Sequence, residues 1–475
     1  MKKMLALVLA LCMVLALTAC GASSDVTAKL DEISTALKGV QSSLDALNSG
    51  APAPAAPAAP AEDDAPAAPA GEGKVYYLNF KPEFDGALQT LAADYTAETG
   101  VPVKVVTAAA GTYGDTLTAE MSKSEAPTLF VLTNDAMVDE WGDYAMDLAG
   151  TPVAEQAVTD DYNLFSPDGA LVGLGYCYES YGIITNKALL EEAGYSVADI
   201  TDFASLKAIA DDIHARADEL GFDAFAPNGL DGSSSWRFSG HLANMPLFYE
   251  YRDKGLNVGA MPETIDGTYL DNFRQIWDLY IDDSSADKTS LTTSTGDEAE
   301  AAFGNGEAVF YQNGTWEFGN LTGTFGMDPA TITMIPIYCG VDGEADAGLC
   351  SGTENHWAVN VNASDADKQA TLDFLYWLVT SDEGTQTLAD ELGAVPFAAA
   401  KTPENVFCAA ANELTAAGKY NVAWAFNDTP NVDSWRGTVV TAMAAYSADQ
   451  SDANWEQVVS AFVDGWAIEW ATVNG

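Results

Sequence analysis

Basic residues are scarce in this chain of 475 residues: 20 Lys and Arg stand against 70 Asp and Glu, and the formal net charge is −50. A field of that sign repels the phosphates of nucleic acids and the surfaces of anionic lipids, so we expect neither as a partner. Histidine is rarer still, and its three residues lie far apart at positions 214, 241 and 356. Because a metal site needs several ligands close together, this scatter argues against a histidine metal centre.

Motifs of the common enzyme classes are absent as well. The chain has no H-E-x-x-H, no G-x-S-x-G, no phosphate loop and no C-x-x-C. Acidic pairs do not identify a glycosidase here, because 70 carboxylates make such pairs common. We therefore predict no catalytic residue, no metal and no cofactor.

Long apolar runs are absent after the N-terminus, where residues 1–20 have the pattern of a secretory signal. Lys2 and Lys3 precede an apolar run from Leu5 to Leu17, which is short for a membrane span. The end of this segment, Leu-Thr-Ala-Cys followed by Gly, resembles a bacterial lipobox with Cys20 as the lipidated residue. We expect cleavage there and a lipid anchor on the outer face of the membrane; an uncleaved membrane helix is the alternative.

Residues 21–50 are predicted to form a helical stalk and residues 51–73 an extended linker. The apolar residues of the stalk are spaced alternately by four and three, as in a heptad seam: Val26, Leu30, Ile33, Leu37, Val40, Leu44 and Leu47. Weak self-association through residues 26–47 is one interpretation, and an amphipathic helix lying on another surface is the other. The linker is rich in Pro and Ala, so it cannot bury a core and should act as a spacer.

The remainder, residues 74–475, begins with alternating strands and helices. Strands are expected at 74–80, 101–106 and 128–132, with helices at 84–99 and 113–122 between them. This order favours a parallel sheet, in which ligands bind beyond the carboxyl ends of the strands. That rule places five polar residues at one rim: Asn79, Lys81, Glu83, Asn134 and Asp135.

The stretch from Leu171 to Tyr195 contains one isolated acid. Glu179 interrupts an otherwise uncharged run from Ala170 to Thr185, and Asn186 is a plausible cap for the helix that follows. A carboxylate in a buried strand costs several kcal/mol unless it is paired. Either it accepts hydrogen bonds from the protein backbone, or it lines a cleft and receives them from a ligand. Further on, a helix from Phe203 to about Leu220 is expected.

Two later segments present tryptophan from loops. Trp236 and Arg237 follow a Gly-rich loop, which would place a flat apolar face beside a forked donor, although a core tryptophan would give the same pattern. In the segment 301–318, AAFGNGEAVFYQNGTWEF, a short strand leads into Gly-Thr-Trp at Trp316. A sugar offers one C–H face that an aromatic ring can bury while the hydroxyls at its edge stay free.

These segments together resemble the extracellular solute-binding proteins of sugar ABC transporters, including the maltodextrin-binding family. The resemblance rests on Glu179 seven residues before Asn-Lys-x-Leu, on the segment 301–318, and on TSDEG and LGAVPF within 351–397. The segment 301–318 is similar, nearly residue for residue, to the family's F-x-x-G-x-A-x-x-x-x-G-x-W pattern and ends it at Trp316. It implies an α/β, two-lobe periplasmic-binding-protein-like (type II) fold with a hinge, here preceded by the stalk. Lobe 1 would comprise about 74–177 and 358–405, and lobe 2 about 180–355 and 410–475.

The resemblance also assigns roles by position. Asp135 and Glu179 would be cleft carboxylates, and Trp316 and the Trp435–Arg436 pair would supply sugar-stacking surfaces. The residues that flank Asp135 differ from the maltodextrin pattern, which weakens the case for maltose itself. The ligand set expected from residues and resemblance together is Asn79, Lys81, Glu83, Asn134, Asp135, Glu179, Trp236, Arg237, Trp316, Trp435 and Arg436.

The expected function is the capture of a carbohydrate, an oligosaccharide in the first instance, and its delivery to a membrane permease. A polyamine-binding protein of the same fold is the alternative, and a secreted glycoside hydrolase or a stalked adhesin are rivals from other classes. Four cysteines would remain after processing in an oxidising compartment. Cys339 and Cys350 flank a Gly/Asp-rich loop and are the predicted disulfide, while the state of Cys177 and Cys408 is left open.

Overall fold

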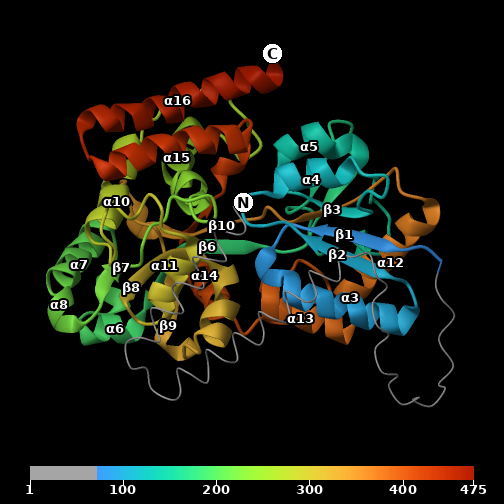
Figure 1. Ribbon diagram of the computed structural model, residues 1–475, viewed down its shortest axis with the longest axis horizontal. Helices are drawn as coiled ribbons and strands as arrows, with labels where there is room; N and C mark the ends of the chain where they lie inside the picture. The colour runs from blue at the N-terminus through green and yellow to red at the C-terminus, as the bar shows by residue number, and fades with distance from the viewer. Residues whose placement is uncertain (1–71) are drawn as a thin grey trace, which may run out of the picture. The chain divides into compact units, whose positions relative to one another are not determined.

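The computed structural model describes residues 72–475 (Figure 1). The predicted signal peptide, Cys20, the stalk 21–50 and the linker up to residue 71 lie outside the described residues. None of the helices within 72–475 has the length and hydrophobicity that crossing a membrane requires.

Two six-stranded sheets organise the described residues, one in each lobe. In lobe 1 the strand order is β2 (Val103–Thr107), β1 (Val75–Asn79), β3 (Leu129–Leu132), β11 (His356–Val359), β5 (Leu171–Gly175) and β4 (Leu164–Phe165). As the β-α-β-α-β pattern predicts, β1 pairs in parallel with β2 and β3. Strand β11 returns from the far part of the chain and inserts antiparallel between β3 and β5.

The sheet of lobe 2 is built around one strand. Its order is β12 (Tyr420–Ala423), β10 (Ala347–Gly352), β6 (Glu179–Asn186), β8 (Ala308–Gly314) and β7 (Asp223–Phe225), with β9 (Ile332–Ile335) paired to β6. All eight residues of β6 are buried, which agrees with the apolar run in the sequence. Glu179 is the first residue of this strand.

Helices cover both sheets. In lobe 1 these are α3 (Asp85–Thr99), α4 (Tyr113–Met121), α5 (Asp135–Trp141), α12 (Asp365–Thr380) and α13 (Asp382–Leu392); Figure 1 shows α3 and α13 on one side of the sheet and α4 and α5 on the other. In lobe 2 they are α6 (Lys187–Glu192), α7 (Phe203–Ala215), α8 (Ala217–Leu220), α9 (Asn244–Lys254), α10 (Leu270–Asp282), α11 (Gly296–Gly304), α14 (Val406–Ala416), α15 (Val432–Ala448) and α16 (Asp452–Asn474).

The helix expected from Phe203 to Leu220 is divided in two. Asp202 caps α7, as the sequence suggested, by accepting the N–H of Ser205. At Arg216 the backbone leaves the helical conformation, with φ −108° and ψ 12°. The Arg216 guanidinium there donates to the carbonyl of Ala193, so a tertiary hydrogen bond accompanies the break between α7 and α8.

The chain passes between the lobes three times, at residues 176–178, 353–355 and 393–405. The three crossings are hydrogen-bonded to one another. Tyr176 N–H donates to the carbonyl of Asn355 at 2.9 Å, and Tyr178 N–H donates to the carbonyl of Ala394 at 2.8 Å. Short crossings that lie side by side are the expected architecture of a hinge, because a few residues can absorb the rotation of a whole lobe.

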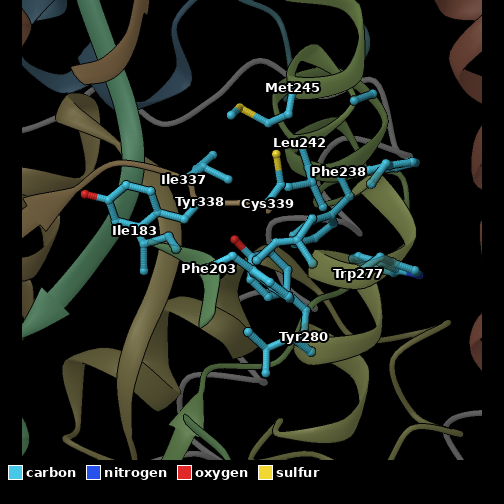
Figure 2. Close-up of a cluster of buried hydrophobic side chains, with 14 of the residues drawn as sticks. Ile183, Phe203, Phe238, Leu242, Met245, Trp277, Tyr280, Ile337, Tyr338 and Cys339 are labelled. Atoms are coloured by element: carbon cyan, nitrogen blue, oxygen red, sulfur yellow. The ribbon is translucent and has the colours of Figure 1, made fainter. Parts of the chain in front are cut away.

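The largest apolar core lies in lobe 2 and joins side chains from distant segments. Figure 2 shows Ile183 of β6 near Phe203 of α7, Phe238, and Trp277 and Tyr280 of α10. Lobe 1 has its own core between the sheet and helices α3, α12 and α13. Each lobe therefore buries a separate hydrophobic interior, as a two-domain chain of this length should.

The predicted disulfide is wrong. Cys339 and Cys350 are both buried free thiols, as are the other two cysteines of the described residues. The Cys350 thiol lies 3.6 Å from the sulfur of Met245 instead. The loop that follows Cys339 is closed by a carboxylate, because Glu344 accepts the N–H groups of Cys339, Gly340 and Val341.

Candidate functional site

An ion pair joins the two lobes beside the hinge. Lys81 follows β1 in lobe 1, and its Nζ lies 2.7 Å from Oε1 of Glu83 and 2.7 Å from Oε1 of Glu179, the first residue of β6. Burial alone would lower the pKa of Lys81, but the two carboxylates outweigh it and raise the pKa well above its usual value. Lys81 therefore stays charged, and its ammonium links the segment after β1 to lobe 2.

The second oxygen of Glu179 is also occupied. Its Oε2 accepts the side-chain N–H of Asn355 at 2.7 Å, and Asn355 lies in the second crossing. The view of Glu179 as an isolated carboxylate is therefore wrong, because both oxygens have buried partners from elsewhere in the chain. Contact between Glu179 and a solute stays a prediction, since a carboxylate has more lone pairs than these two bonds use.

Aromatic side chains gather in lobe 2 opposite Lys81. Trp316 lies on the 3₁₀ turn Thr315–Glu317 after β8, and its ring centroid is 5.8 Å from Lys81 Nζ. Trp236 and His241 belong to the segment before α9, with ring centroids 6.0 Å and 5.4 Å from that of Trp316. The two tryptophans are partly exposed, so this cluster presents accessible aromatic surface between the lobes.

His241 is a member of this cluster that sequence reasoning missed. It is buried and stacks on Tyr181 with a centroid distance of 4.0 Å and an angle of 6°. Burial, helped by the positive charges of Arg436 and Arg237, lowers its pKa well below the ordinary value, so the ring is neutral. The sequence places His241 only five residues after Trp236, which was the available sign that the two lie near each other. The direction of the His241 side chain, however, depends on the π-helix Arg237–Leu242.

The lobes also meet at the rim, away from the hinge. A Cβ placed on Gly111 of lobe 1 would lie 2.8 Å from the carbonyl oxygen of Gly232 in lobe 2, and one on Gly114 would lie 3.3 Å from Oδ2 of Asp433. Glycine permits this approach because it has no side chain to separate the backbones. The two lobes are therefore in contact at these points.

An acid and a base, Glu354 and Arg436, interact electrostatically near the second crossing. Glu354, in the second crossing, has its pKa raised to about 7 by burial, and the positive charge of Arg436 on α15 acts against that shift. Arg436 is only partly buried and was in the predicted set, whereas Glu354 was missed. Asp135 is half-buried at the start of α5, and burial together with Asp139 raises the pKa of its carboxyl.

Two predicted residues of the rim have structural positions instead. Asn79 is fully buried, and its amide donates to the carbonyl of Lys81 and to the hydroxyl of Thr107. Asn134 is the N-cap of α5 and accepts the N–H of Met137. These hydrogen bonds hold the loops that position Lys81 and Asp135. Contact of either side chain with a solute stays a prediction.

Two residues of the predicted Trp–Arg pairs are likewise buried. Trp435 lies between α15 and α16 with its ring 4.8 Å from that of Phe462, and its Nε1–H donates to the Phe462 carbonyl. Arg237 is 2% exposed, donates to Ser234 and lies over the ring of Tyr311. In each pair one member faces the interlobe region and the other faces the core, because neighbouring helical residues point in different directions.

The family model for bacterial extracellular solute-binding proteins matches residues 90–416. This chain belongs to that family. The matched range includes Glu179, Trp236, His241 and Trp316, and therefore most of the interlobe site. Within residues 72–475, no three His, Cys, Asp or Glu side chains are grouped so as to hold a metal ion.

Solved structures confirm the two-lobe fold of this solute-binding protein. It is similar to RafE in complex with raffinose (TM-score 0.66, 16% identity, 83% of this chain and 99% of RafE covered). The solute receptor AcbH, described as having an exclusive preference for β-D-galactopyranose, aligns with TM-score 0.66 and 12% identity over 84% of this chain and 100% of AcbH. The GacH receptor of Streptomyces glaucescens, solved unliganded and with acarbose, aligns with a TM-score of 0.61 and 18% identity. The alignment covers 84% of this chain and 99% of GacH.

Proposed function

We propose that the protein captures a carbohydrate, an oligosaccharide in particular, between its lobes and delivers it to the permease of an ABC transporter. The observation that carries this proposal is the partly exposed ring of Trp316, which lies between the lobes beside Trp236. Aromatic rings bury the C–H face of a sugar, and a few polar groups then fix its orientation. Glu83, Asp135 and Arg436 are partly exposed and supply such groups.

The solute class is supported by the relatives. Proteins of similar fold bind raffinose and prefer β-D-galactopyranose, and another is a chitin oligosaccharide binding protein. Their identity to this chain is 12–18%, so they support a sugar without selecting one. Two adjacent tryptophans suit a solute of more than one ring, which favours an oligosaccharide.

A polyamine is the second candidate, and the charges around the aromatic cluster are what favour it. Acidic groups outnumber basic ones there: Glu83, Glu179, Glu317, Glu354 and Asp433 against Lys81, Arg237 and Arg436. Burial raises the pKa of Glu317 to about 8 and that of Glu354 to about 7, and a bound cation would favour the ionised form of both. A cation over an aromatic face is attracted by the ring quadrupole. Any ligand screen should therefore include polyamines beside sugars.

The first experiment is a thermal-shift screen of the protein against mono- and oligosaccharides and polyamines. A solute at 100 times its Kd should stabilise the folded state by about 2.7 kcal/mol. Stabilisation by oligosaccharides and not by polyamines is the expected result. Stabilisation by polyamines alone would favour the second candidate, and hydrolysis of a sugar during incubation would favour a glycosidase.

Calorimetry on Trp316→Ala then tests the site itself. Loss of the stacking ring should cost about 2–4 kcal/mol of binding free energy, as for aromatic hot spots elsewhere. Trp377→Ala is the matched control, because Trp377 is also partly exposed but lies on α12 and bonds to Glu98. Near-normal affinity in the Trp316 variant, or an equal loss in both, would remove Trp316 from the site.

We further propose that Cys20 carries lipid and that residues 21–73 hold the lobes away from the membrane. The support is the lipobox pattern and the Pro/Ala composition of the linker. The mature protein should fractionate with membranes, and Cys20→Ala should release it. An intact mass that corresponds to an unmodified N-terminus beyond residue 20 would contradict the anchor. Sedimentation with and without residues 21–73 tests self-association through 26–47.

A further inference from the structure

The ring of Trp316 is held in place by its own turn. A Cβ on Gly314 would lie 2.3 Å from atoms of the indole, so the ring covers the backbone at a position that only glycine allows. This contact sets the distance between the indole ring and the backbone of Gly314. It does not determine how the ring is turned within its own plane. A directional contact is needed for that, and Asn313 provides it.

Asn313 uses all of its side-chain hydrogen-bonding capacity around this turn. Its Oδ1 accepts the indole N–H of Trp316 at 2.8 Å and the backbone N–H of Gly314 at 3.0 Å. Its Nδ2 donates to the hydroxyl of Tyr311 and to Oε1 of Glu317, both at 2.7 Å. The orientation of the amide is determined by chemistry, because an indole N–H and a backbone N–H can only donate.

The support beneath Asn313 is rigid. It is 2% exposed and lies in β8, which pairs with the fully buried strand β6. A side chain with four satisfied bonds on a central strand has one allowed arrangement, since any rotation would leave a buried donor or acceptor without a partner.

We propose that Asn313 is the positioning residue of the solute site, which sets the orientation of the Trp316 ring toward a bound sugar. Asn313 does not touch the solute; it acts through the indole N–H. It also ties that ring to Glu317, so the stacking surface and a nearby carboxyl group move together. The expected effect of Asn313 on solute affinity rests on the proposed function. Its expected effect on the orientation of the Trp316 ring does not.

The test uses the full chain labelled with ¹⁵N-tryptophan, in three variants. Asn313→Ala removes the acceptor, so the indole resonance of Trp316 (assigned with Trp316→Phe) should move or broaden. The double variant Asn313→Asp with Glu317→Gln rebuilds the pattern, because Asp accepts from the indole and Gln supplies the lost amide donor. Asn360→Ala is the control: Asn360 is a buried, hydrogen-bonded asparagine of lobe 1 that does not touch Trp316.

In Asn313→Ala we expect a changed Trp316 resonance. We also expect this variant to bind the oligosaccharide found in the screen about ten-fold more weakly, which corresponds to roughly the free energy of one hydrogen bond. The double variant should restore both, and the control should lower only the melting temperature. An unchanged resonance in folded Asn313→Ala, or no recovery in the double variant, would overturn the proposal. A shifted resonance with affinity unchanged in Trp316→Ala would instead reject the sugar site and leave the positioning of the ring intact.

Discussion

Glu179→Gln is the substitution that best separates a structural from a solute-binding carboxylate. Glu179 accepts from Lys81 and from Asn355, and its side chain is 5% exposed. Gln keeps the shape and one acceptor for Asn355, but its amide cannot pair with the ammonium of Lys81. We therefore expect the solute-free protein to lose stability, which a carboxylate reserved for a solute would not cause.

The magnitude follows from burial. Breaking a buried ion pair by removing one partner costs about 3–5 kcal/mol, and the lower end applies because Glu83 still neutralises Lys81. Unfolding entropy of about 2.1 cal/mol/K per residue over about 400 residues gives about 0.8 kcal/mol/K, so about 3 kcal/mol lowers the melting temperature by about 3–4 °C.

Glu83→Gln is a matched control on the same ammonium. Its Oε1 lies at the same 2.7 Å from Lys81 Nζ, but its side chain is 27% exposed rather than 5%. Water can replace the more exposed partner, so this variant should lose no more than about 1 kcal/mol. Calorimetric melting of both variants without solute decides the matter. Equal losses, or an unchanged Glu179→Gln protein, would refute the argument from burial.

Three further predictions concern residues outside the site. Trp435→Ala should cost about 3–5 kcal/mol in urea unfolding, because it empties a buried site between α15 and α16, while sugar affinity stays unchanged; lost affinity in a stable protein would contradict this. Burial, with Asp211 nearby, raises the pKa of Asp283 to about 7, so the folded state retains a proton that the unfolded chain releases above about pH 4. Asp283 should therefore lower the free energy of unfolding as pH rises from 4 to 7. Asp283→Asn should be more stable than wild type at pH 8 but not at pH 4, and equal stability of the two proteins at both pH values would contradict the assignment. Reducing agent should leave the melting temperature unchanged because Cys339 and Cys350 are free, and a clear drop would indicate a disulfide.

Much of lobe 1 could be predicted from the sequence because its signals are local. The helix expected at 84–99 is observed as α3, Asp85–Thr99, and the helix expected at 113–122 as α4, Tyr113–Met121. In lobe 2, the expected cap Asn186 accepts the N–H groups of Ala188 and Leu189 at the start of α6. The parallel pairing of β1 with β2 and β3 followed from the alternation of strands and helices. These features depend on side-chain period and capping within a few residues, which are visible in a single sequence.

The site could be predicted only in part. Trp236 and Trp316 were identified by loop position, and they do lie together between the lobes. Trp435, near the start of a helix, was proposed from the family resemblance and lies in the core, because the packing of α16 against α15 covers it. A loop or helix start therefore indicates that a tryptophan is available, but the element packed against it decides which side of the ring stays open.

By itself, the sequence determined the family, the alternation of strands and helices, and the acidic balance of the chain, since periodicity, motifs and composition need no knowledge of distant contacts. Tertiary structure alone decided which charges meet. Lys81 and Glu179 are 98 residues apart and form one buried ion pair, while Cys339 and Cys350 are separated by a short loop and stay unbonded. Separation along the chain does not set distance in a fold where three crossings bring remote segments to one hinge. The pairing of a buried carboxylate, and the fate of a thiol, follow from which side chains the packed sheets place beside it.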